Sequence, residues 1–244
     1  MKLGIALSIR DKSTRLPSKT WANLGGLPLI KFMLERLVST GLPVFIATST
    51  DPGDDKISEL KSSSIRIFRG HPEDKLQRYL DLCEQEALDF LVVVDGDDPL
   101  IDLTKILHVV DVQKSSNSNL ITFKNFALGI SPIGISKILL AEAVKNKKQN
   151  DSEVWLSFVR SLRSINEYVL YNDNESINDD IRLTIDYPED LLLIEICLSI
   201  LNGNPTTPTN EFIDLLNRIP KLCEINSWRN LEYNSIIREK SAII

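Results

Sequence analysis

The sequence is poor in the residues that build disulfide frameworks and zinc sites. It has three cysteines in 244 residues, widely spaced at Cys83, Cys197 and Cys223, and no C-x-x-C pair. An odd, scattered set of this kind is typical of reduced, buried thiols in a cytoplasmic protein. The two histidines, His71 and His108, are too few to favour a zinc site. We therefore expect a cytoplasmic chain without disulfides or structural zinc.

Long apolar runs are also absent. No stretch approaches the roughly 20 apolar residues that a membrane-spanning helix requires. The first apolar run, residues 3–9, is too short and too soon followed by charges for a signal peptide. The chain has 34 acidic and 28 basic residues, and the resulting net charge of −6 argues against a general nucleic-acid or anionic-membrane surface. We expect no nucleic-acid partner and no membrane partner.

Strand-like and helix-like segments alternate along the first half of the chain. The strand-like runs are 3–9, 44–48, 65–69 and 90–94, and segments with helical spacing lie at 28–41, 54–62 and 73–87. The runs 3–9 and 90–94 are apolar at nearly every position, as in parallel strands that are covered on both faces. This pattern predicts a three-layer, doubly wound α/β fold with a mainly parallel sheet.

The second half of the chain is less regular. We expect strands at 120–123, 167–171 and 181–185, and helices from about 104 and at 136–144, 152–162, 188–201 and 210–218. No internal repeat or low-complexity linker divides the sequence. We expect one domain over residues 1–244, with a protruding segment at about 125–180.

The loop after the first strand is rich in basic residues and reads R-x4-R-L-P-x-K. Arg10, Lys12, Arg15 and Lys19 place four cations within ten residues. Arginine binds phosphate oxygens through a planar fork and lysine through a compact ammonium, so the loop suits a polyphosphate. A solvated basic turn is the alternative interpretation.

Acidic residues follow two of the expected strands. Asp95, Asp97 and Asp98 come directly after the run 90–94, and Asp186 follows the run 181–185. In open α/β sheets, ligands bind beyond the carboxyl ends of the strands. Crowded carboxylates repel one another unless a cation shares the site, and Mg²⁺ binds one or two carboxylates together with substrate phosphates. Helix capping is the alternative role for both acidic segments.

These motifs resemble the cytidylyltransferases. The family includes the CMP-Kdo and CMP-acylneuraminate synthetases, and the chain is most similar to the spore-coat polysaccharide branch (SpsF-like). The resemblance rests on segments 10–19 (RDKSTRLPSK), 24–30 (LGGLPLI), 96–102 (GDDPLID), 182–191 (RLTIDYPEDL) and a tail at 224–233. It covers nearly the full chain and is weakest between about 125 and 180.

The resemblance implies a fold of the nucleotide-diphospho-sugar transferase type and the transfer of CMP from CTP to a sugar, with release of pyrophosphate. An acidic acceptor is expected, such as a nonulosonate or a Kdo-like sugar, and the segment 125–180 is expected to build a homodimer and part of the sugar site. Mg²⁺ would be held by Asp97 and Asp186. The residues expected to act in catalysis are Arg10, Lys19 and Asp97.

The resemblance also implies two sets of binding residues. The nucleotide-binding set is Arg10, Ser13, Arg15, Lys19, Ala47, Thr48, Asp95 and Gly96. The candidate cations for an acidic sugar are Lys124, Arg160, Arg163 and Arg182. An ordinary surface position is the alternative for each of these four cations.

Three residues in the basic loop depart from the family pattern. Ile9, Lys12 and Ser18 stand where the family usually has alanine, glycine and glycine. Glycine permits close backbone approach and positive φ, so the two lost glycines bear on nucleotide binding. Two other functions stay open. The D-x-D motif of residues 95–97 permits a metal-dependent glycosyltransferase, and the lost glycines permit a non-catalytic nucleotide-binding relative.

Overall fold

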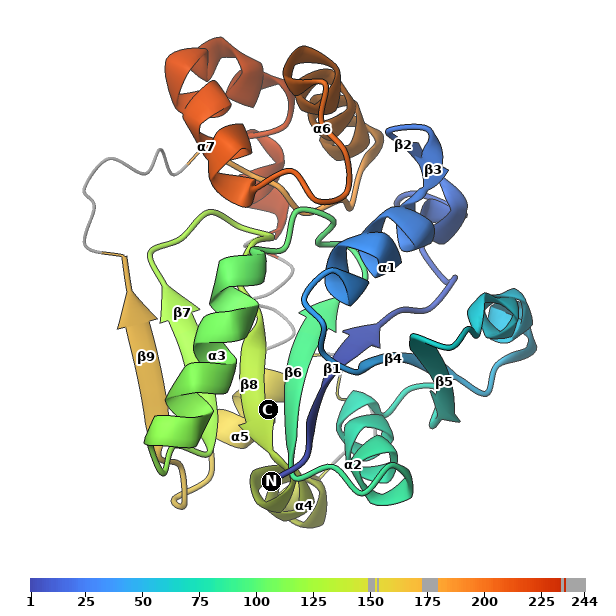
Figure 1. The fold of residues 1–244 in the computed structure, drawn as a ribbon, viewed down its shortest axis with the longest axis vertical. Coiled ribbons are helices and arrows are strands. Elements are labelled where there is room, and N and C mark those ends of the chain that lie inside the picture. The colour runs from blue at the N-terminus through green and yellow to red at the C-terminus, as the bar shows by residue number, and fades with distance from the viewer. Residues whose placement is uncertain (149–151, 153, 173–179, 234, 236–244) are drawn as a thin grey trace.

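A computed structural model describes residues 1–148, 152, 154–172, 180–233 and 235. Seven strands form one sheet in the order β5-β4-β1-β6-β8-β7-β9, with helices on both faces (Figure 1). The strands are β1 Leu3–Ser8, β4 Val44–Ser49, β5 Ile65–Gly70, β6 Phe90–Asp95, β7 Leu120–Lys124, β8 Ile133–Ser136 and β9 Glu167–Tyr171. Only β8 runs antiparallel to its neighbours. The predicted α/β fold class is confirmed.

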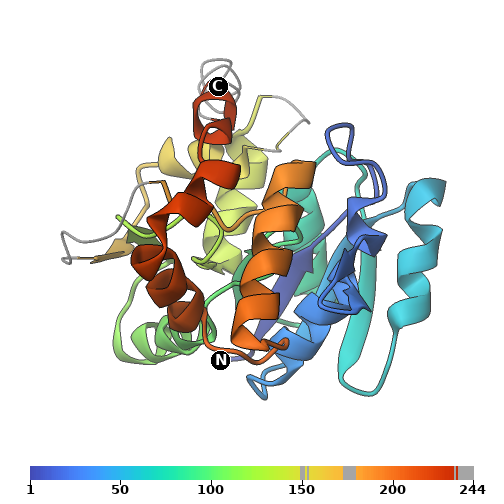
Figure 2. The ribbon, with the colours of Figure 1, turned by 90° about the horizontal axis from the view of Figure 1, so that it is seen from above.

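The helices cover the sheet in two layers (Figure 2). They are α1 Leu29–Val38, α2 Lys75–Gln85, α3 Leu103–Ser115, α4 Lys137–Asn146, α5 Trp155–Arg160, α6 Pro188–Leu201 and α7 Thr209–Arg218. Helices α1, α3, α6 and α7 share one hydrophobic cluster with the sheet, and α2, α4 and α5 share the other. No helix among the described residues is both long and apolar enough to cross a bilayer.

Several short elements complete the chain. They are the 3₁₀ helices Lys19–Trp21, Pro52–Leu60 and Pro220–Ile225 and a two-stranded hairpin of β2 Asn23–Leu24 and β3 Leu27–Pro28. The helix expected at 54–62 is therefore a 3₁₀ helix that begins at Pro52, where proline fixes a helix-compatible φ and needs no N–H partner.

Strands β1 and β6 are adjacent and parallel, which fixes the position of the functional loops. Ser8 at the end of β1 pairs in register with Asp95 at the end of β6. Both strands are almost wholly buried, because α/β sheets of this kind are covered on both faces. The basic loop and the acidic loop therefore leave the sheet side by side.

The expected strand at 181–185 is wrong, because only an isolated bridge joins Leu128 to Arg182. Instead of pairing as a strand, the segment makes single backbone hydrogen bonds to two other parts of the chain. The Leu183 N–H donates to Leu128 O at 2.9 Å, and the Ile185 N–H donates to Asp97 O at 2.7 Å. These bonds bring the segment to the loop that follows β6.

The described part of the segment 125–180 contributes to the sheet and its helical layers. Strand β8 lies between β6 and β7, and β9 forms the edge beyond β7. Helix α4 packs against α2, and α5 packs against α4. Residues 149–151, 153 and 173–179 lie outside the described residues, and the protruding arm stays a prediction.

Candidate active site

A cleft of about 850 Å³ opens where β1 and β6 end. Most of the basic loop lines one part of it, and residues 95–98, with Asp186, line another. The described lining contains six acidic and six basic side chains, so their charges nearly balance. A nucleoside triphosphate carries roughly four negative charges at neutral pH, so it would need a further cation in this cleft.

Residues of the basic loop make contacts that hold the loop in place beside the cleft. Ser13 Oγ accepts the Leu16 N–H at 3.1 Å and so closes a local turn within the loop. Arg10 donates to the carbonyl oxygen of Pro72 at 2.6 Å. Lys12 forms an ion pair with Asp51, although its side chain is more than half exposed. The predicted phosphate-binding loop is thus held in shape by contacts that its own residues make.

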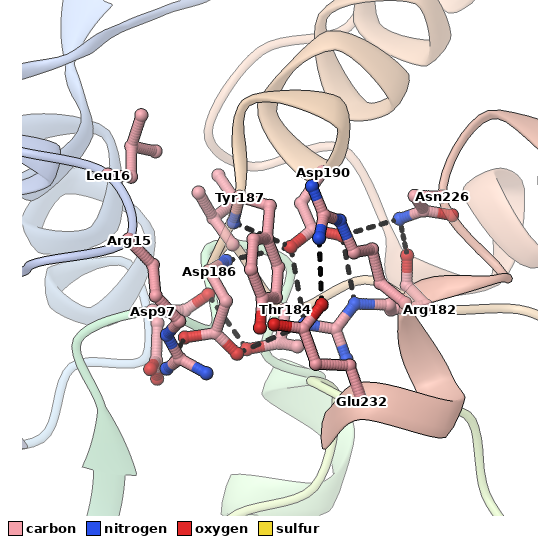
Figure 3. A network of polar contacts seen from close by, with 12 residues as sticks. Arg15, Leu16, Asp97, Arg182, Thr184, Asp186, Tyr187, Asp190, Asn226 and Glu232 are labelled. Carbon is pink, nitrogen blue, oxygen red and sulfur yellow. Dashed lines mark hydrogen bonds and ion pairs between the residues drawn. The ribbon is translucent and has the colours of Figure 1, made fainter. Parts of the chain in front are cut away.

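Arg15 and Lys19 reach the carboxylates on the far side of the cleft (Figure 3 shows Arg15). Arg15 Nη2 lies 2.6 Å from Asp186 Oδ1. Lys19 Nζ lies 3.4 Å from Asp97 Oδ2 and 3.5 Å from Asp186 Oδ1, and it donates to Ile185 O at 2.7 Å. The structure therefore brings together the cations and carboxylates that the sequence placed in one site.

Position 96 must be glycine because the basic loop and the loop after β6 approach each other closely there. The Gly96 N–H donates to Ser8 O at 2.8 Å. A Cβ at this position would lie 2.7 Å from the Ile9 side chain and 2.8 Å from Ser8 O. Only glycine permits this approach, which holds Asp95 and Asp97 beside the end of β1.

Ser18 occupies a backbone conformation that glycine prefers. Its φ is +56°, in the left-handed region, just before the 3₁₀ helix that carries Lys19. The family pattern has glycine at this position, so the departure has a physical consequence. Lys12 is not among the described non-glycine residues with positive φ.

Replacing Ser18 with glycine should raise the free energy of unfolding by up to about 1 kcal/mol, because a left-handed φ strains any residue with a Cβ. Lys12→Gly should lower it slightly, because it adds chain entropy without relieving strain. Denaturant unfolding of both variants measures the difference. A Ser18→Gly variant less stable than Lys12→Gly would contradict this reading.

Asp186 is held by a buried polar network (Figure 3). The fully buried Arg182 contacts Asp186 Oδ2 at 3.0 Å and Asp190 Oδ1 at 2.8 Å. Asp190 also accepts the backbone N–H groups of Asp186 and Tyr187 at 2.8 and 2.9 Å, which caps the start of α6. Asn226 donates to Asp190 Oδ1 at 2.9 Å. Asp190 thus caps the start of α6 and fixes the backbone that carries Asp186.

The cleft carboxylates differ in electrostatic environment. Burial acts to raise the pKa of Asp97, but Lys19 and Lys75 outweigh it, and the pKa is lowered. Burial raises the pKa of Asp186, and the charge of Asp97 adds to this effect. Burial, with Asp97 and Asp95 adding to it, also raises the pKa of Asp98 well above its usual value. Added positive charge would relieve this crowding.

The donor set fits a hard divalent cation. Asp97 and Asp186 offer carboxylate oxygens, and both lie within 3.5 Å of the single Lys19 ammonium. The described residues contain no cluster of three or more acidic, histidine or cysteine side chains that could hold a metal. Mg²⁺ suits such a pair, because it commonly binds one or two carboxylates and takes its other ligands from phosphate and water.

Several predicted binding residues lie elsewhere. Ala47 and Thr48 are fully buried within β4, so neither side chain reaches the cleft. Lys124 ends β7 beside the Tyr171 ring, and Arg160 pairs with Glu167 at 3.3 Å. None of these residues lines the cleft.

Arg182 needs a separate correction. It was expected to face the sugar, but its side chain has no exposed surface and forms salt bridges with the two aspartates of the α6 start. Its contribution is to hold Asp186 in place. Arg163, the remaining candidate cation, is exposed and does not line the cleft.

Other cleft residues were not predicted. Lys75 forms an ion pair with Asp95 and lines the cleft. Burial disfavours its charge, but Asp95 raises the pKa of Lys75, which therefore stays protonated. Trp155 packs edge-on against Tyr79 and also lines the cleft. Tyr233 joins the lining from the tail. Only Tyr233 lies in a segment that carries the family resemblance, and that position does not assign it a role.

Comparison with known proteins supports the fold. The SpsF spore coat polysaccharide biosynthesis protein of Bacillus subtilis is 25% identical over 224 residues, 88% of this chain and 93% of that protein. A cytidylyltransferase structure from Leptospira borgpetersenii is 26% identical with a TM-score of 0.83, covering 91% of this chain and 97% of its own. A CMP:2-keto-3-deoxy-manno-octonic acid synthetase complexed with CTP shares the fold, with a TM-score of 0.60, 14% identity and coverage of 82% and 100%.

The match to a known family extends over most of the chain. Residues 7–191 match the cytidylyltransferase family, and this range contains the basic loop, the loop after β6 and the start of α6. The matched range thus includes every residue of the ion-paired site formed by Arg15, Lys19, Asp97 and Asp186. The chain belongs to the cytidylyltransferase family and is a nucleotidyltransferase.

Proposed function

We propose that the chain transfers CMP from CTP to a hydroxyl group of a sugar and releases pyrophosphate. The observation that carries this proposal is the position of Lys19. Its ammonium lies within 3.5 Å of both Asp97 and Asp186 and on the same loop as Arg10 and Arg15. A loop suited to a triphosphate and carboxylates suited to a metal thus face each other across one cleft.

The reaction requires positioning and charge neutralisation more than covalent chemistry. Arg10, Arg15 and Lys19 would bind the β- and γ-phosphate oxygens and stabilise the charge that develops on the leaving pyrophosphate. In the structure, Arg15 and Lys19 are paired with carboxylates. Phosphate binding would therefore exchange one set of anionic partners for another.

Asp97 and Asp186 are the residues that would hold Mg²⁺. When bound, the ion supplies positive charge for the phosphates and lowers the pKa of a coordinated hydroxyl group. Asp97 is one-third exposed to the cleft, whereas Asp186 is almost fully buried and fixed by Arg182. Asp186 would thus fix the position of the ion, and Asp97 would present an accessible carboxylate oxygen to it.

The acceptor class is part of the proposal. The resemblance favours an acidic sugar, whose carboxylate needs a cation. Outside the basic loop, the cations lining the described cleft are Lys75 and Arg78. Arg78 is almost fully buried and donates to the carbonyl oxygens of His71 and Pro72. Lys75 pairs with Asp95 but keeps 16% of its side chain exposed, so it is the better candidate to contact that carboxylate.

We also propose that the chain forms a homodimer. Ile138 on α4 is 81% exposed and Tyr171 at the end of β9 is 51% exposed, and both lie within the segment expected to dimerise. Light scattering of the intact chain should give twice the mass of the single chain. A single-chain mass at micromolar concentration would contradict this.

Truncating a phosphate-binding side chain should weaken CTP binding. A charge-assisted hydrogen bond contributes about 1.5–3 kcal/mol, so Arg15→Ala or Lys19→Ala should lower CTP affinity by roughly 10- to 150-fold. Lys12→Gly is the matched control, because Lys12 lies on the same loop but pairs with Asp51. It should change affinity little. Isothermal titration with CTP and Mg²⁺ measures all three, and equal effects would contradict the assignment.

Nucleotide selectivity tests the proposal itself. Thermal shift with each of the four nucleoside triphosphates and Mg²⁺ should stabilise the protein most with CTP, by about 2.7 kcal/mol at 100 times the dissociation constant. Stabilisation by a sugar nucleotide but not by CTP would favour a glycosyltransferase. Stabilisation by CTP without any turnover would favour a non-catalytic relative.

A further inference from the structure

A helical turn near the C-terminus, residues 229–233, forms part of the cleft wall. Glu232 and Tyr233 both line the cleft, although the match to the cytidylyltransferase family ends at residue 191. Figure 3 shows Glu232 beside the network around Asp186. The cleft therefore has a component that the family match does not cover.

This turn and the residues just before it are fixed to the start of α6 by polar contacts. Asn226, which has no exposed surface, donates from Nδ2 to Arg182 O at 3.0 Å and to Asp190 Oδ1 at 2.9 Å. Arg229 contacts Glu189 Oε1 at 3.1 Å. The tail is thus anchored to the same network that positions Asp186, so its place in the cleft wall is a built feature of the fold.

Tyr233 lines the cleft and packs against the network that positions Asp186. Its ring centroid is 5.1 Å from the Arg182 guanidinium carbon. Burial and the charges of Asp98, Asp97 and Asp186 raise the pKa of Tyr233. The phenol therefore stays neutral and keeps an O–H group that can donate and accept a hydrogen bond.

The two ligands of the reaction need different chemistry. A triphosphate needs cations, and the basic loop supplies them. A sugar needs neutral hydrogen-bonding groups and apolar or aromatic surface. Within the described lining, Thr184, Tyr233 and Trp155 meet that need, and none of them belongs to the basic loop. In phosphoryl transfer, the attacking and leaving oxygens lie roughly in line, so the acceptor must approach from the side away from the pyrophosphate.

We propose that Tyr233 contacts the acceptor sugar through a hydrogen bond to one of its hydroxyl groups. The turn at residues 229–233 then helps to select the acceptor through the side chain that it presents to the cleft. This inference rests on the proposed transfer of CMP to a sugar, and it adds a specificity-determining residue from outside the matched family range.

The test compares Tyr233→Phe with Leu231→Ala. Phenylalanine keeps the ring against Arg182 and removes only the hydroxyl, and Leu231 is an 81% exposed residue of the same turn. With CTP, Mg²⁺ and a panel of acidic and neutral free sugars, Tyr233→Phe should raise the KM for the accepted sugar by about three- to tenfold. The KM for CTP should stay within about twofold, and Leu231→Ala should change neither.

Two results would overturn the inference: an unchanged KM for the sugar in Tyr233→Phe, or an equal rise in the KM for CTP. Saturation-transfer NMR of the same sugars with CMP-loaded protein reads sugar binding without turnover. A wild-type chain that binds CTP but transfers CMP to no sugar would contradict the proposed function. In that case the NMR experiment still tests the inference, because Tyr233→Phe should weaken sugar binding even without turnover. Failure of the proposed function and failure of the inference therefore give different results.

Discussion

Replacing Asp97 with asparagine should lower the rate of CMP transfer by about 10²- to 10³-fold, as expected when one charged group that stabilises the transition state is lost. The side chain is one-third exposed and forms an ion pair with Lys19 at 3.4 Å. The free energy of unfolding should therefore change by less than about 1 kcal/mol. Steady-state pyrophosphate release and denaturant unfolding measure the two effects.

Asp111→Asn is the control for this prediction. Asp111 lies on α3, its side chain is 77% exposed, and it forms only a 4.0 Å pair with Lys114. Both turnover and stability should match those of the wild type. If Asp97→Asn keeps near-normal Mg²⁺-dependent activity, Asp97 does not hold the metal.

Arg182→Ala should destabilise the protein by about 3–5 kcal/mol, because it leaves the buried Asp190 without its cation and removes one of the cations that pair with Asp186. Arg182 is fully buried and contacts Asp186 and Asp190. Arg160→Ala is the matched control: Arg160 forms a half-exposed pair with Glu167, and its loss should cost less than about 1 kcal/mol. Denaturant unfolding distinguishes the two.

Activity gives a second readout for the same pair of variants. Arg182→Ala should also lose turnover in conditions where it remains folded, because Asp186 loses the contact that fixes its carboxylate. Arg160→Ala should keep full activity, although both arginines were expected to bind the sugar. Similar losses of stability in the two variants would contradict the buried network as described.

The part of the site that could be predicted follows from local sequence and sheet topology. The apolar runs at 3–9 and 90–94 marked buried parallel strands, and polar residues at the carboxyl ends of such strands meet at one edge. Ser8 and Asp95 are in register, so the basic and acidic loops adjoin as expected. Gly96 between them also had a readable signal, since it stands in the D-G-D string.

The parts that could not be predicted depend on contacts between distant segments. Asp186 reaches Asp97 through the bond from Ile185 N–H to Asp97 O, and no pattern in the run 181–185 distinguishes that arrangement from a strand. Strand β8 has only four residues, too few for a periodic signal. Arg182 reads as a surface residue, because arginine is rarely buried without a partner.

The most direct test of CMP transfer is ³¹P NMR of wild-type protein with CTP, Mg²⁺ and the panel of acidic and neutral sugars. The proposed function predicts that the α-phosphorus of CTP moves into a CMP-sugar diester while pyrophosphate appears in equal amount. Unchanged CTP in the presence of every sugar, or nucleoside diphosphate released from a sugar nucleotide instead, would contradict it.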